Sequence, residues 1–219
     1  MRFTPFMMHT LYDIKNYAQQ TLSNHRASHA WDHTQRVYRL CLRIGEKEGA
    51  DLVVLKIAAL LHDIGRNHQD ENKGQICHAQ KGAEISRELL KDYPLPQDKI
   101  DNIIHAIRSH RFRGDCRPES IEAKVLFDAD KLDAIGAIGI ARDYLFAGEI
   151  GARLHNPDVD PEESEPYSED DTGYREYKVK LSKIKDRMLT TEGRRLALGR
   201  HEFMESFFNR FLEEHDGLK

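Results

Sequence analysis

Several absences narrow what this chain of 219 residues can be. Its longest uninterrupted apolar run, Ile57 to Leu61, is far shorter than the roughly 20 residues that a membrane span requires. The N-terminal residues lack the continuous apolar core of a signal peptide. The formal net charge is −4, so no excess of positive charge indicates a nucleic-acid surface. We therefore expect a cytoplasmic protein without a membrane or nucleic-acid partner.

Cysteine is also scarce, and glycine does not form a phosphate loop. The cysteines, Cys41, Cys77 and Cys116, are scattered and odd in number, which is typical of reduced thiols. This pattern excludes a disulfide framework and a cysteine zinc cluster. The glycines of "AIGAIGIA" lie inside a helical pattern, whereas a Gly-rich phosphate loop follows a strand.

Helical periodicity is present nearly everywhere, and no stretch shows the alternation of a strand. A predicted helix begins after Asp51, which can cap it, and stops at Gly65. The stretch 119–147 is apolar on nearly all sides, so we expect one long buried helix there. We predict one all-α domain, residues 1–219, with a core at about 25–147. The other predicted helices cover residues 9–23, 29–48, 77–92, 97–111, 174–190 and 192–215.

Residues 155–173 form an acidic segment between these helices. The segment holds three prolines and eight Asp or Glu residues, with no Lys or Arg. Such a composition is typical of a solvated loop. A loop beside an active site can also act as a lid. The sequence leaves both interpretations open.

The predicted helices carry metal-ligand side chains on their apolar faces. One histidine on such a face is most often an ordinary core residue. Several of them together with two carboxylates favour a shared divalent cation, because an unpaired buried carboxylate costs several kcal/mol. His105 shares a face with Asp101 and Arg108 instead, so we expect it to be exposed. The inward-facing residues are His33 with His29 one turn earlier, His62 with Asp63, His78, His110 and Asp130.

The order of these residues resembles a known family. The stretches "SHAWDHTQRVYRL", "AALLHDIGRN" and "DADKLDAIGAIGIAR" contain His33, His62-Asp63 and Asp130. They resemble the H…HD…D signature of the HD-domain metal-dependent phosphohydrolases. The C-terminal "MLTTEGRRLALGRHEFMESFF" also resembles the tail of the small stand-alone bacterial and archaeal members. The resemblance covers most of the chain and implies an all-α helical bundle with a metal site at its centre.

The resemblance implies His33, His62, Asp63 and Asp130 as ligands of a divalent ion. Asp130 is preferred to Asp128 and Asp133 because it follows a small alanine, as in the family, and Asp133 is expected to be structural. Adjacent residues on a helix point about 100° apart, so His62 and Asp63 can reach one ion only at a helix end. Gly65 permits the backbone to turn there. Imidazole and carboxylate ligands suit Mn, Fe, Co, Ni, Zn or Mg.

A second ion or a substrate phosphate could lie next to the first ion. His78 and His110 are placed for either role, and His29 and Arg111 are further candidates. Relatives with two metals often carry another histidine at the position of Ser109. We therefore expect one tightly held metal and a weak or empty second position.

The predicted activity is hydrolysis of a phosphate ester by metal-activated water, with a nucleotide or other small phosphorylated metabolite as substrate. Asp63 or Asp130 would orient the water or accept its proton. Cationic side chains would offset charge on the phosphoryl oxygens, and the candidates are Arg66, Lys131, Arg111 and Arg113. Alternative hypotheses are a nucleotide-sensing module without turnover, a di-iron oxygenase of the HD type, and a helical scaffold with an accidental cluster.

Overall fold

The computed structural model describes residues 5–23, 31–72, 75–111 and 116–219. These residues form helices, turns and loops, and no strand occurs among them, which confirms the all-α prediction. Within the same residues, no helix is both long and apolar enough to cross a membrane. The chain divides into two compact units, residues 1–130 and 131–219, which are described separately.

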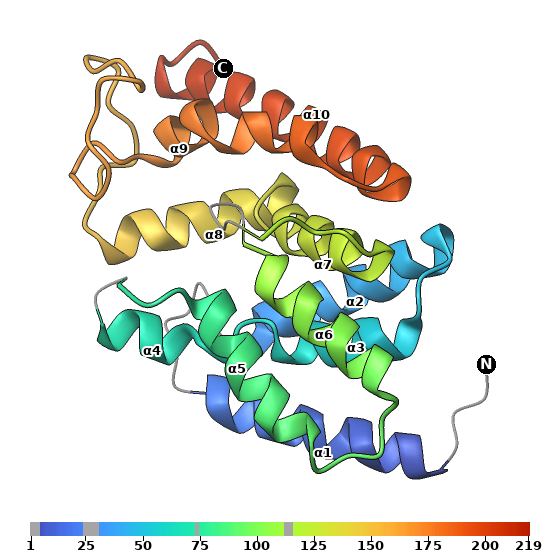
Figure 1. The fold of residues 1–219 in the computed structure, drawn as a ribbon. Helices are drawn as coiled ribbons and strands as arrows, with labels where there is room; N and C mark the ends of the chain where they lie inside the picture. Colours follow the sequence, from blue (N-terminus) through green and yellow to red (C-terminus); the bar gives the residue numbers. More distant parts are fainter. Residues whose placement is uncertain (1–4, 24–30, 73–74, 112–115) are drawn as a thin grey trace. The chain divides into compact units, whose positions relative to one another are not determined.

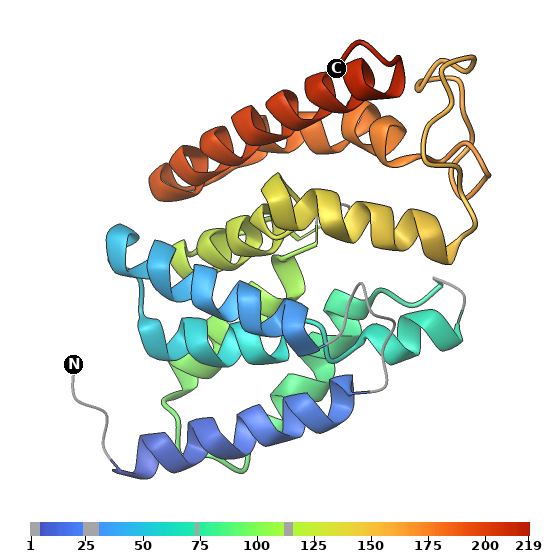
Figure 2. The same ribbon diagram turned by 180° about the vertical axis from the view of Figure 1, so that it is seen from behind.

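The first unit is built around α3 (Leu52–Leu61), which is apolar along almost its whole length. α3 lies between α1 (Pro5–Leu22) and α2 (Trp31–Glu48), as Figure 2 shows, and it also packs on α6 (Gln97–Ser109). α5 (His78–Leu90) lies side by side with α6 (Figure 1). α7 (Ile121–Leu132) begins in this unit. A helix buried on all sides can carry polar residues to the centre of the unit only at its ends.

The N-terminus of α3 is fixed by the expected cap. The Asp51 carboxylate accepts hydrogen bonds from the backbone N–H groups of Val53, at 2.8 Å, and Val54, at 3.4 Å. Lys99 of α6 donates to the same carboxylate at 2.6 Å. Glu122 of α7 accepts from the Asp51 backbone N–H at 2.7 Å. The start of α3 is thus held by α6 and α7, which sets where its opposite end lies.

Gly65 follows the C-terminal end of α3, as predicted, but for a different reason. Its φ is not positive, so the turn itself does not require glycine. A Cβ atom at Gly65 would lie 2.2 Å from the carbonyl oxygen of His78 and 2.6 Å from the backbone nitrogen of Gly82. Gly65 therefore permits the first turn of α5 to approach the end of α3 closely. A short helix, α4 (Arg66–Glu71), which the sequence did not predict, follows at once.

The prediction of one helix over residues 119–147 is wrong. The chain forms α7 and then α8 (Gly136–Glu149), with a turn between them. Gly136 has a φ of +78°, a conformation that favours glycine and interrupts a helix. A Cβ atom there would lie 2.9 Å from Cγ of Arg200, whose guanidinium donates to the carbonyl oxygen of Leu132. The bend therefore gives Arg200 access to the end of α7.

The second unit contains α8 and the C-terminal helices. The predicted helix 174–190 is wrong in form, because α9 (Gly173–Val179) is followed by a 3₁₀ helix, η2 (Leu181–Arg187). The last predicted helix is confirmed as α10 (Thr191–His215), which begins with the Thr190 hydroxyl accepting from the Gly193 N–H at 3.0 Å. Tyr177 of α9 stacks on Phe208 of α10 with ring centroids 4.4 Å apart.

The acidic segment 155–173 contains no helix before Gly173, as its composition predicted. It nevertheless has defined internal contacts. Arg175 of α9 reaches back to Ser164, donating from Nη2 to its carbonyl oxygen at 2.9 Å and from Nε to its hydroxyl at 2.8 Å. Asp171 accepts from the Arg175 Nη1 at 2.8 Å and from the Tyr167 N–H at 2.7 Å.

Candidate metal centre

Four histidines of the first unit surround the buried carboxylate of Asp63, which is 1% exposed. Asp63 Oδ2 lies 3.6 Å from Nε2 of His33 on α2 and 3.6 Å from Nε2 of His62 at the end of α3. Asp63 Oδ1 lies 3.6 Å from Nε2 of His78 on α5 and 3.7 Å from Nε2 of His110 after α6. The carboxylate therefore belongs to two adjacent groups of potential ligands. The first group contains His33, His62 and Asp63 Oδ2, and the second contains His78, His110 and Asp63 Oδ1.

Hydrogen bonds on the outer side fix the tautomer of three of these histidines. The Nδ1 atom of His62 lies 2.8 Å from the Ala59 carbonyl oxygen, and that of His110 lies 2.6 Å from the Ile107 carbonyl oxygen. The Nδ1 atom of His78 lies 2.8 Å from the side-chain oxygen of Gln69. Because these oxygens only accept, each Nδ1 carries a hydrogen and each ring turns its Nε2 toward Asp63. Imidazoles that bind metals are commonly oriented in this way.

The rings of His62 and His78 are neutral at ordinary pH. Burial lowers the pKa of His62 to about 4 and that of His78 to about 2, although the Asp63 carboxylate opposes both shifts. Burial alone would raise the pKa of Asp63, but the Arg66 guanidinium and the His62 ring hold it well below its usual range. A charged carboxylate thus faces the Nε2 atoms of His62, His78 and His110, whose Nδ1 atoms are turned outward to protein oxygens.

The inner atoms of these side chains lie close enough together to share one positive charge. The Nε2 atoms of His33 and His62 are 3.3 Å apart, and those of His78 and His110 are 3.2 Å apart. Asp63 Oδ2 is buried and accepts no hydrogen bond from the part of the chain that the structure describes. Nitrogen and carboxylate ligands around a divalent cation would satisfy all of these atoms at once. The residues therefore fit a metal ion.

The carboxylates of α7 differ in their surroundings. Asp130 Oδ1 lies 3.4 Å from Nε2 of His33, so this carboxylate reaches the group on the Oδ2 side of Asp63. Asp128 is fully buried, and with Asp130 it adds to the effect of burial in raising the pKa of the Cys41 thiol. Asp133 belongs to the second unit, where it accepts from Arg142 at 2.7 Å, in keeping with the structural role expected for it.

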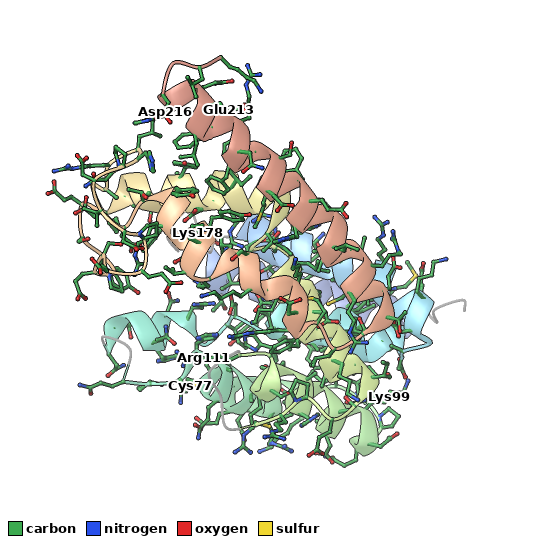
Figure 3. All side chains as sticks on the ribbon, turned by 90° about the horizontal axis from the view of Figure 1, so that it is seen from above. Cys77, Lys99, Arg111, Lys178, Glu213 and Asp216 are labelled. Carbon is green, nitrogen blue, oxygen red and sulfur yellow. The ribbon has the colours of Figure 1, made fainter. Side chains whose placement is uncertain are left out.

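Two predicted cations lie near the histidines. Arg66, the first residue of α4, donates from Nε to Asp63 Oδ1 at 3.0 Å. Arg111 follows His110, and its side chain lies beside the Cys77 thiol at the start of α5 (Figure 3), where it contributes to lowering the pKa of His78. Lys131 follows Asp130 in α7, and its role remains a prediction.

Other predicted residues lie elsewhere or outside the described part of the chain. His29 and Arg113 fall outside the described residues. His105 is half-buried, less exposed than expected, and its Nε2 accepts from the Glu119 N–H at 3.0 Å. The hydroxyl of Ser109 donates to the His105 carbonyl oxygen at 2.7 Å, within its own helix.

Gln69 is a residue that the sequence analysis missed. It lies on α4 and orients His78 across nine positions of sequence. No periodic pattern identifies it, because α4 has only six residues and no apolar stripe. In the sequence, Gln69 is marked only by its position shortly after His62 and Asp63.

Comparison with known proteins agrees with this geometry. Residues 30–135 match the model of the HD domain family. The uncharacterized protein YpgQ of Bacillus subtilis is 34% identical over 210 residues, which cover 94% of this chain and 93% of YpgQ. The crystal structure of YpgQ in complex with ADP is similar, with a TM-score of 0.74, 33% identity and 96% of each chain covered.

More distant similarities extend the same family. An HD-superfamily hydrolase from Bacillus thuringiensis has a TM-score of 0.75 at 27% identity, with 96% of this chain and 98% of that chain covered. Ribonuclease Y of Alkaliphilus metalliredigens is 36% identical over 102 residues, which are 47% of this chain but 19% of that enzyme. The identity to YpgQ over nearly the whole length, together with the HD match, shows that this chain belongs to the HD-domain superfamily of hydrolases.

Proposed function

We propose that this protein is a metal-dependent phosphohydrolase that cleaves a phosphate ester of a nucleotide or another small phosphorylated metabolite. The observation that carries the proposal is Asp63, a buried carboxylate whose Oδ2 has no hydrogen bond within the described residues and faces two imidazole nitrogens. His33, His62, Asp63 and Asp130 would hold the ion. When bound, such an ion lowers the pKa of a coordinated water toward about 7 and so supplies hydroxide at neutral pH.

The protein's own residues would do the remaining work. Asp63 and Asp130 hold or accept the proton of the attacking water. Arg66 and Arg111 offset the negative charge that develops on the phosphoryl oxygens, because both guanidinium groups lie next to the histidines. Lys131 is a third candidate for that task through its position after Asp130.

The second group around Asp63 supports a role close to the phosphate. His78 and His110 present Nε2 toward Asp63 Oδ1, so they suit a second, weakly held ion or a place beside the substrate phosphate. A nucleotide substrate is supported by YpgQ, because that relative is described in complex with ADP.

A metal-supplemented hydrolysis screen tests the proposal. Protein stripped by a chelator should be inactive on an aryl phosphate and on a nucleotide panel, and Mn, Co, Ni or Mg should restore phosphate release. His110→Gln should impair that release, whereas His105→Gln, five residues earlier on α6, is a matched control. Full activity of the metal-free protein would overturn the proposal. Nucleotide binding without turnover would favour the sensing module, and uptake of oxygen by iron-loaded protein would favour the oxygenase.

A further inference from the structure

We propose that a pocket on the first unit, separate from the metal centre, binds a nucleotide. The pocket has a volume of about 490 Å³, within the range of small-molecule sites. It is lined by residues of α1, α2 and α3, the helices that Figure 2 shows side by side. Its lining combines aromatic rings with cations, namely Tyr12, Trp31, Tyr38, Lys15, Arg39 and Lys56.

The charge of the pocket is opposite to that of the whole chain. Asp and Glu outnumber Lys and Arg by 37 to 33 in the sequence, yet none of the described residues that line the pocket is acidic. Lys15 and Arg39 line the pocket and are exposed, so a ligand that enters from solvent can reach their charges. Burial lowers the pKa of Lys56, although Glu46 opposes the shift. The pocket therefore favours a negatively charged ligand.

The remaining lining favours a flat apolar group on the same ligand. Tyr12 is 62% exposed and Met8 is 64% exposed, so large side chains that normally avoid water stand at the opening. Aromatic rings such as Trp31 stack on nucleobases, and arginine adds cation–π attraction. A ligand that joins an aromatic ring to phosphate groups satisfies both parts of the lining, and a nucleotide is the common class with that chemistry.

The pocket uses a different face of the helices from the metal centre. On α2, Trp31 and Tyr38 line the pocket, whereas His33 lies on the buried face with Val37. On α3, Leu60 lines the pocket two residues before His62. None of the described residues that line the pocket is a candidate metal ligand, so binding there and hydrolysis can be measured independently.

Trp31 provides the measurement, because it is the single tryptophan of the sequence and lines the pocket. Full-length protein in chelator is titrated with ADP while tryptophan fluorescence is recorded. We expect a saturable change. Adenosine and inorganic pyrophosphate should each bind at least roughly tenfold more weakly than ADP, because each satisfies only part of the lining.

Matched variants decide whether the signal comes from the pocket. Lys15→Gln combined with Arg39→Gln should weaken ADP binding at least roughly tenfold and leave metal-dependent hydrolysis unchanged. Lys91→Gln is the control, since it removes a positive charge that pairs with Glu88 on the surface of α5. Arg39→Gln alone, checked by circular dichroism, serves if the double variant does not fold.

Asp63→Ala separates this proposal from the proposed function, because it should abolish hydrolysis and keep the ADP-dependent fluorescence change. The pocket assignment is overturned if no saturable change occurs or if the double variant binds ADP as well as the control. It is also overturned if the change disappears in Asp63→Ala but persists in the double variant. Binding of an acidic peptide in the absence of ADP binding would assign the pocket to a protein partner instead.

Discussion

The two units of this chain bury charged side chains in opposite ways. In the second unit, Arg175 is 9% exposed, and its guanidinium donates to Asp171 and Ser164, so each buried charge meets a complementary group. In the first unit, Arg66 donates to one oxygen of Asp63, but the other oxygen faces the Nε2 atoms of His33 and His62 without a hydrogen bond from the described residues. A buried charge with its own partner stabilises a fold, whereas a cluster of acceptors is completed only by a cation from outside.

Asp63→Ala tests this contrast most strongly. The variant should lose tightly bound divalent metal, and turnover should fall at least roughly 10³-fold, because the activated water loses its carboxylate. Helical circular dichroism should persist, since the substitution also removes a buried negative charge. Metal content after gel filtration and phosphate release are the measurements. Asp101→Ala removes a surface carboxylate paired with Arg87 and is the control. Normal turnover in Asp63→Ala would disprove the assignment of the centre.

His78→Ala asks whether both groups around Asp63 hold an ion. Because the first group keeps all of its ligands, we expect about one tightly held equivalent of Mn in wild type and no change in the variant. KM should rise roughly 10- to 100-fold if His78 binds the substrate phosphate. Two equivalents that survive gel filtration in wild type, falling to one in His78→Ala, would show instead that the second group is a tight metal site.

The sequence predicted the helices that surround the candidate metal centre because their apolar faces have a clear period. His33, His62, His78 and His110 each end or interrupt such a face, so their convergence followed from helix geometry. The family resemblance then selected Asp130 among the three neighbouring aspartates. Gln69 could not be found in this way, since its role depends on where a helix of six residues happens to lie.

The breaks between helices were harder to predict. The apolar run through residues 119–147 looks continuous, and the position of its turn depends on Gly136 and on Arg200, which is 64 positions away. The role of Gly65 was misjudged for a related reason. Its requirement comes from the backbone of α5, a contact that local sequence does not reveal.

Arg175→Ala tests the paired charges of the second unit. Loss of the guanidinium leaves Asp171 and the Ser164 carbonyl oxygen without their donor, so stability should fall by about 2–4 kcal/mol. That corresponds to a drop in Tm of roughly 5–15 °C in a chain of this size. Arg153→Ala, which breaks an exposed pair with Glu169, should cost less than about 1 kcal/mol.

The same variant tests whether the acidic segment, which Arg175 contacts, is a structural loop or a lid. If residues 155–173 are a structural loop, KM and kcat of Arg175→Ala at a temperature where it is folded should stay within about twofold of wild type. A larger change in either constant would favour a lid. Replacing the segment with a short Gly/Ser linker provides an independent measurement of the same point. An unchanged Tm in Arg175→Ala would contradict the proposed stabilising role of the network.

Asp143 of α8 is an exception to the contrast, because this half-buried acid has a buried Oδ2 that accepts no hydrogen bond within the described residues. Burial raises the pKa of Asp143 to about 8, and Glu176 and Asp171 add to the shift while Lys180 opposes it. The folded chain therefore holds a proton that the unfolded chain releases near pH 4. Stability from this group is fully present below pH 4 and is lost as the pH rises toward about 8.

Asp143→Asn should remove this dependence, because an amide resembles the protonated acid and does not ionise. Thermal unfolding of wild type and variant is compared at pH 5 and at pH 9. We expect the Tm difference in favour of the variant to widen by the equivalent of about 1–2 kcal/mol, since water entering the site relieves part of the full effect. Asp186→Asn, an exposed carboxylate of η2, controls for net charge. A difference that is constant between the two pH values would mean that Asp143 is ionised in the folded protein, and the second unit would then contain an unpaired buried charge of its own.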